Sequence, residues 1–168
     1  MRVILAGLCL VFVIGCGSAP RLVVPAPIGD SISMALLDKH PSEKRYQLYL
    51  LTSSGLSGSG GMSAFNEETT WSLQLSESER TRLNTSIKAA GWIEGSPVGE
   101  PEAMTGETDR LLVISTRTSS QRVAFEIFAG EQGFGPVTTE ILETLREISV
   151  RRFNDHVNGL PSTGDSIR

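Results

Sequence analysis

An apolar run at the beginning of the chain constrains the fold more than any other feature of its 168 residues. It extends from Val3 to Ile14 without a charged side chain, and Arg2 supplies a positive charge just before it. A membrane-spanning helix needs about 20 apolar residues, whereas a run of this length is typical of the central region of an export signal. We therefore expect residues 1–15 to be a signal peptide, which leaves 153 residues to fold. The alternative is an uncleaved anchor or a buried helix.

The residues that end this run, Val13-Ile14-Gly15-Cys16, resemble the lipobox of bacterial lipoproteins. The resemblance implies that a diacylglyceryl group is attached to the sulfur of Cys16 and that the chain is cleaved between Gly15 and Cys16. Several acyl chains would hold the protein at the bacterial cell envelope, because one chain alone binds a membrane only reversibly. Gly17 rather than aspartate follows the cysteine, which predicts the outer membrane if the host is Gram-negative.

Charge and cysteine content exclude several classes of partner and site. Removing residues 1–15 takes away Arg2 and changes the net charge from −4 to −5, which gives no electrostatic attraction to nucleic acid. Cys9 lies inside the expected signal, so the processed chain keeps only Cys16 and forms neither an internal disulfide nor a cysteine zinc site. His40 and His156 lack the spacing of metal ligands. We expect no metal and no cofactor.

The first half of the processed chain predicts a tether, two strands and a helix. Residues 16–43 are rich in proline near their beginning and are interpreted as a tether with a short helix around 31–38. Alternating apolar residues predict strands over 45–52 and 69–75. Ser76 and Glu79 form a capping box, which predicts a helix to about Ala90, followed by Gly91 as its left-handed C-terminal residue.

The second half repeats the order of strand, strand and helix. Residues 94–108 are expected to form an acidic loop, and 110–117 and 121–129 to form a hairpin. A helix is predicted over about 137–157, and 159–168 is expected to be a disordered tail. The pattern predicts an α+β fold for a single domain over 44–158: an antiparallel sheet of about four strands, strand–strand–helix twice, with two helices packed on one face.

No catalytic signature stands out in this pattern. The Ser/Gly-rich segment 53–61 contains neither Gly-x-Ser-x-Gly nor Ser-x-x-Lys, and it lacks the lysine of a phosphate-binding loop. Among the clustered carboxylates, Glu77 and Glu79 belong to the capping box, and Glu140, Glu143 and Glu147 to the polar face of the last helix. The chain is therefore expected not to be an enzyme. Segment 53–61 is either a permissive turn or bulge between strands, or an interaction loop with Leu56 at its tip.

The order of elements, together with the turn Ser53-Ser54-Gly55-Leu56-Ser57-Gly58 and the run Asp109-Arg-Leu-Leu-Val-Ile, resembles the emfourin-type inhibitors of thermolysin-like metalloproteases. The resemblance covers about residues 45–150. It implies a small α+β domain whose turn approaches the protease, with Ser54, Gly55, Leu56 and Gly58 as the contact residues. Ser54 stands where the family pattern has glycine, and Leu56 where it often has an aromatic residue.

Three functions remain open. The leading interpretation is a membrane-tethered, non-enzymatic binding domain, with protease inhibition among its candidate activities and a protease or envelope protein as its partner. The second is a structural or accessory lipoprotein of the envelope, and the third is a hydrolase. An exposed apolar patch around Leu56 would favour the first, a flat apolar face elsewhere the second, and a deep pocket with a perturbed carboxylate or histidine the third.

Overall fold

The computed structural model describes residues 22–101 and 109–158. The expected signal peptide, Cys16, the tail 159–168 and part of the acidic loop 94–108 lie outside these residues. Within them the chain forms, in order, β1 (Ser33–His40), β2 (Arg45–Leu51), β3 (Leu56–Gly60), α1 (Gly61–Phe65), β4 (Trp71–Leu73), α2 (Glu77–Ala89), β5 (Leu111–Arg117), β6 (Arg122–Phe128) and α3 (Pro136–Asn158).

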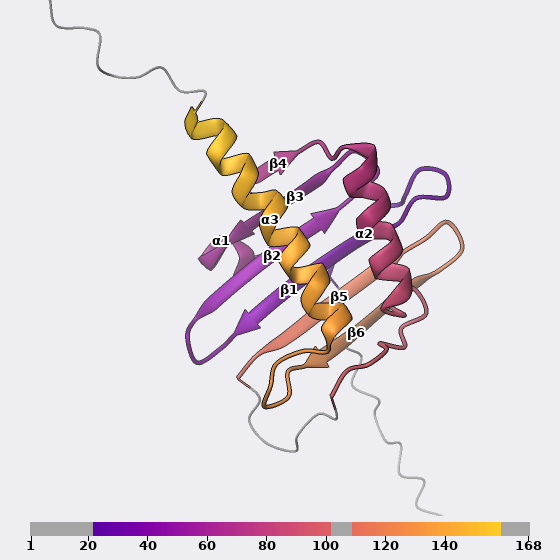
Figure 1. Ribbon diagram of the computed structural model, residues 1–168, viewed down its shortest axis with the longest axis vertical. Helices are drawn as coiled ribbons and strands as arrows, with labels where there is room; N and C mark the ends of the chain where they lie inside the picture. The colour runs from indigo at the N-terminus through magenta and orange to yellow at the C-terminus, as the bar shows by residue number, and fades with distance from the viewer. Residues whose placement is uncertain (1–21, 102–108, 159–168) are drawn as a thin grey trace, which may run out of the picture.

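The strands form one antiparallel sheet in the order β4-β3-β2-β1-β5-β6. The predicted α+β class is confirmed, but the sheet has six strands where about four were expected. The two additional strands are β1 and β3. Figure 1 shows α2 and α3 lying side by side across one face of this sheet, as predicted for two helices.

Strand β1 corrects both the tether predicted over 16–43 and the helix predicted around 31–38. It occupies the middle of the sheet, where Leu36 pairs with Tyr49 of β2 on one side and Ile114 of β5 on the other. Met34 and Leu36 are buried beneath the helices, whereas Ala35 and Leu37 are buried on the opposite face. A strand buried on both faces has a continuous apolar run without alternation, and such a run also matches helical spacing.

Several predicted elements agree closely with the structure. The capping box at the beginning of α2 is present: the backbone N–H of Glu79 donates to Ser76 Oγ, and the N–H of Ser76 donates to Glu79 Oε2 at 2.9 Å. Gly91 has φ +71° after the helix, as a left-handed C-terminal residue requires. The β5–β6 hairpin and α3 also lie where they were predicted.

Two hydrophobic clusters hold the domain together. The larger lies between the sheet and the two long helices, and its fully buried members include Leu83 and Ile87 of α2, Ile141 and Leu145 of α3, and Trp92. The smaller lies on the opposite face, where α1 contributes Ala64 and the segment before β1 contributes Leu22 and Val24. Helices α2 and α3 therefore cover one face of the sheet, whereas α1 and the segment before β1 pack on the other.

Candidate functional site

The turn between β2 and β3 is tight and takes up only the first residues of segment 53–61, because the rest of this segment belongs to β3 and to the first residue of α1. The N–H of Thr52 donates to the carbonyl of Gly55 at 2.8 Å, and the N–H of Gly55 returns a bond to Thr52 at 3.3 Å. Thr52 Oγ1 also lies 2.8 Å from Ser54 Oγ. These bonds fix a two-residue hairpin loop that presents the exposed side chain of Ser54 to solvent.

The two glycines among the predicted contact residues have a structural role. A Cβ atom on Gly55 would lie 2.1 Å from the backbone oxygen of Leu73, and one on Gly58 would lie 2.4 Å from the backbone oxygen of Leu48. Both distances are far below van der Waals contact, so only glycine lets β3 approach its neighbours this closely. Both residues are buried.

Leu56 was predicted at the tip of an exposed loop, and this prediction is wrong. Leu56 is the first residue of β3 and is only 1% exposed. It pairs with Leu51 of β2 and Leu73 of β4, and it belongs to the core cluster beneath the helices. Because the side chain of Leu56 is buried in the core, it cannot serve as an exposed apolar contact in this conformation.

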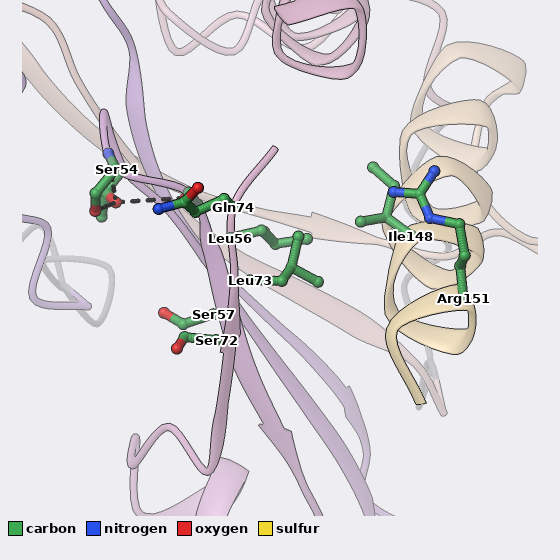
Figure 2. A pocket seen from close by; sticks show the side chains of 10 residues that line it. Ser54, Leu56, Ser57, Ser72, Leu73, Gln74, Ile148 and Arg151 are labelled. Atoms are coloured by element: carbon green, nitrogen blue, oxygen red, sulfur yellow. Dashed lines mark hydrogen bonds between the residues drawn. The ribbon is translucent and has the colours of Figure 1, made fainter. Parts of the chain in front are cut away.

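An open groove of about 570 Å³ nevertheless adjoins this turn, between the edge of the sheet and α3. Figure 2 shows Leu56 and Leu73 pointing from the strands toward Ile148 of α3, which gives the groove an apolar floor, while Ser57 and Ser72 lie on the other side of the strands. Ser54, Gly55 and Leu56 line the groove, and Gly58 does not. Three of the four predicted residues therefore share one concave site.

The groove is flanked by an edge strand and by a fixed arginine. Among the residues that the structure describes, β4 is the last strand of the sheet and pairs only with β3, so one side of its backbone has no partner strand there. Arg151 of α3 lines the groove and forms an ion pair with Glu79 of α2. In Glu79, burial raises the pKa, but hydrogen bonds from Ser76 and Arg151 outweigh it and lower the pKa overall. The carboxylate stays ionised and holds the arginine in place.

A second polar cluster, at the opposite end of β1 and β2, was not anticipated from the sequence. Asp38 is 6% exposed and accepts two bonds from Arg110, from Nε at 3.0 Å and from Nη2 at 2.7 Å. Its Oδ1 also lies 3.4 Å from His40 Nε2. The guanidinium of Arg110 stacks 4.8 Å from the ring centre of Phe134. The alternation of Asp38 and His40 would have indicated this shared face, had residues 31–38 been interpreted as a strand.

This cluster forms one wall of a hollow of about 440 Å³ beside α3. Burial is the largest influence on His40 and lowers its pKa from the ordinary value of 6.5, with Asp38 opposing and Arg110 adding to the effect. Burial also raises the pKa of Tyr49, which lines the same hollow. Both groups are therefore neutral at pH 7. Neither hollow holds a group of three or more metal-binding side chains among the residues that the structure describes.

Comparisons with known proteins identify no relative of this chain. No protein-family model, curated protein or solved structure matches the chain. Across 22–101 and 109–158, no helix combines the length and the apolar character needed to cross a membrane.

Proposed function

We propose that this chain is an exported lipoprotein, anchored through Cys16, whose domain is a non-enzymatic module that binds a polypeptide partner. The lipobox-like residues Val13-Ile14-Gly15-Cys16 support the anchor. The groove between β4 and α3 is the observation that supports the binding role. The two features are independent, because one lies in the sequence before the domain and the other in the fold.

The groove suits an extended peptide segment in two respects. The unpartnered side of β4 offers backbone donors and acceptors to a further strand, which is a common mode of peptide recognition. Leu73 is partly exposed and lies beside that edge, with the buried Leu56 and Ile148 behind it, so it can contact an apolar side chain of the bound segment. Arg151 at its margin would favour a partner with a carboxylate nearby.

The arrangement around Asp38 supports a non-enzymatic role. Asp38 and His40 are the pair that most resembles a general base with its orienting carboxylate. Both carboxylate oxygens of Asp38 are already engaged by Arg110, and the contact with His40 is 3.4 Å long. Arg110 therefore neutralises the negative charge of Asp38, which would otherwise stabilise a protonated imidazole on His40. This cluster is better explained as a buried ion pair that ties β1 to the residue preceding β5.

Protease inhibition is the most specific activity that this proposal offers for a test. The fragment 17–168 would be mixed with a thermolysin-like protease and a chromogenic peptide. Slower proteolysis that saturates at a fixed molar ratio is the expected result. Unchanged proteolysis at large molar excess would discard inhibition, but it would leave the binding role to be tested by other means.

A matched pair of variants assigns any effect to the groove. The loops Thr52-Ser53-Ser54-Gly55 and Thr118-Ser119-Ser120-Gln121 have similar side-chain bonds, since Ser120 Oγ lies 3.2 Å from Thr118 Oγ1. Ser54→Arg should weaken binding at the groove, whereas Ser120→Arg places the same side chain on the other hairpin and should not. Capture of envelope proteins by the lipidated chain, followed by comparison of these variants, tests the wider binding role. Equal capture by both variants would remove the groove from the proposal.

A further inference from the structure

The sheet face opposite α2 and α3 carries a short segment that is held in place before β1. The carbonyl of Leu22 accepts a bond from Arg122 Nη2 at 2.8 Å, and the carbonyl of Val24 accepts one from Arg117 Nη1 at 3.4 Å. Leu22 and Val24 are buried against the sheet, whereas Val23 between them is 79% exposed. An apolar side chain is thus directed into solvent by a backbone that is fixed on both sides.

Further exposed apolar side chains lie on the same face. Helix α1 packs there through Ala64, and Phe65 beside it is 53% exposed and meets the ring of Tyr46 at a centroid distance of 5.0 Å. Met62 of the same helix is 66% exposed. Tyr46 lies on β2 two pleats from Leu50, which lines a hollow together with Val23. Val23, Leu50, Tyr46 and Phe65 therefore lie on the same face of the sheet.

The hollow itself has mostly apolar walls. It measures about 240 Å³ and is lined by Leu22, Val23, Ala35, Leu48 and Leu50, with Glu67 and Thr69 beside them. Single apolar residues on a protein surface need no explanation, but several exposed ones on the same face beside an apolar hollow indicate an interaction site. We call the surface formed by Val23, Leu50, Tyr46, Met62 and Phe65 the apolar back face.

The position of the proposed anchor indicates what covers this face. Only six residue steps separate Cys16 from Leu22, and a fully extended chain of that length spans at most about 20 Å. This step rests on the proposed function, because it takes Cys16 to be the lipidated residue. A bilayer that holds Cys16 is then within that distance of Val23, and the anchor supplies a high local concentration of membrane for a weak contact.

We propose that the apolar back face rests on the bilayer surface, with Val23, Met62 and Phe65 dipping into the headgroup region. Zwitterionic lipid suits this contact because the face carries both signs of charge: Glu67 and Glu68 are exposed next to α1, and Arg117 and Arg122 lie beside Leu22 and Val24. Ile148 and Arg151 line the groove from α3, and α3 lies on the sheet face opposite the apolar back face. Docking by the back face therefore leaves the α3 side of the groove open toward a partner.

The test measures which side of the domain meets lipid. The chain beginning at Cys16 is coupled through this single cysteine to a maleimide lipid in phosphatidylcholine vesicles, with or without brominated acyl chains that quench tryptophan emission on contact. Phe65→Trp is compared with Val98→Trp, which replaces another half-exposed apolar residue, located just after α2. Trp71 and Trp92 contribute the same background in both variants.

The emission added by Trp at position 65 should be largely lost in brominated vesicles, and that added at position 98 should be kept. Met62→Trp repeats the measurement at a second exposed position and should behave like Phe65→Trp. Equal emission at positions 62, 65 and 98 in both kinds of vesicle would overturn the proposal. Chemical coupling makes this result independent of natural lipidation. An unmodified Cys16 in cells would contradict the proposed function without changing the orientation that is measured.

Discussion

Leu56, which the interaction-loop interpretation placed at the tip of segment 53–61, is 1% exposed in the core. Leu56→Ala removes three buried carbon atoms, which contribute about 0.8 kcal/mol each, or about 2.4 kcal/mol. The cavity that remains adds to this loss, so we expect the free energy of unfolding to fall by about 3 kcal/mol. That is a large part of the roughly 5–15 kcal/mol that stabilises a typical domain.

Urea unfolding of the 17–168 fragment, followed by emission of the buried Trp92, measures this change. If the free energy of unfolding falls by about 1.5 kcal/mol per molar urea, a loss of about 3 kcal/mol lowers the urea concentration at the unfolding midpoint by about 2 M. Val98→Ala is the matched control, because Val98 is 56% exposed and should shift the midpoint very little. A shift for Leu56→Ala no larger than the shift for the control would refute the placement of Leu56 in the core.

Three further predictions concern the cap, the buried ion pair and pH. Ser76→Ala removes the bond that Ser76 Oγ accepts from the N–H of Glu79 and keeps the bond from the N–H of residue 76 to Glu79. The free energy of unfolding should fall by about 1 kcal/mol, measured as a lower melting temperature; an unchanged melting temperature would contradict the side-chain cap. Asp38→Asn leaves the partly exposed Arg110 unpaired and should cost about 2 kcal/mol; Arg110→Met in the same chain should recover part of this loss, and additive losses would contradict the pairing. Folding lowers the pKa of His40 below 6.5, so the unfolded chain binds this proton at a higher pH than the folded chain. The free energy of unfolding should therefore fall as pH drops below 6.5. His40→Gln should remove this contribution, and an unchanged dependence of stability on pH would assign the effect to another group.

Elements with local signals were predicted well from the sequence. Helix α2 begins at a capping box and ends before Gly91, and both features depend only on neighbouring residues. The β5–β6 hairpin has alternating side chains and a four-residue polar turn, which together specify its pairing. These parts of the fold could be placed because their causes lie within a few residues.

Elements defined by distant contacts were missed. Strand β1 is a strand because β2 and β5 lie on both sides of it, and the apolar residues of 31–38 fit about two turns of a helix equally well. The short β3 was hidden by Gly58 and Gly60, which lower strand propensity. Gly58 also permits the close approach of Trp71 and Leu48.

The residues of the candidate sites also divide into those with a local sequence signal and those brought together only by the fold. Ser54 and Gly55 were identified from a local turn pattern, and the structure places both at the groove. Ile148 and Arg151 complete that groove from a helix that follows nearly a hundred residues later, so only the fold brings them together. The Asp38–Arg110 pair joins residues 72 positions apart, and no local pattern reports such a contact.

Mass spectrometry of the protein extracted from its native envelope tests the central claim most directly. The anchored-module proposal predicts a chain that begins at Cys16, lacks residues 1–15 and carries a diacylglyceryl group on the cysteine sulfur. Digestion would then release an acylated peptide that ends at Arg21. A chain that retains residues 1–15, or one with an unmodified Cys16 thiol, would contradict the anchor, and the membrane location would need another cause.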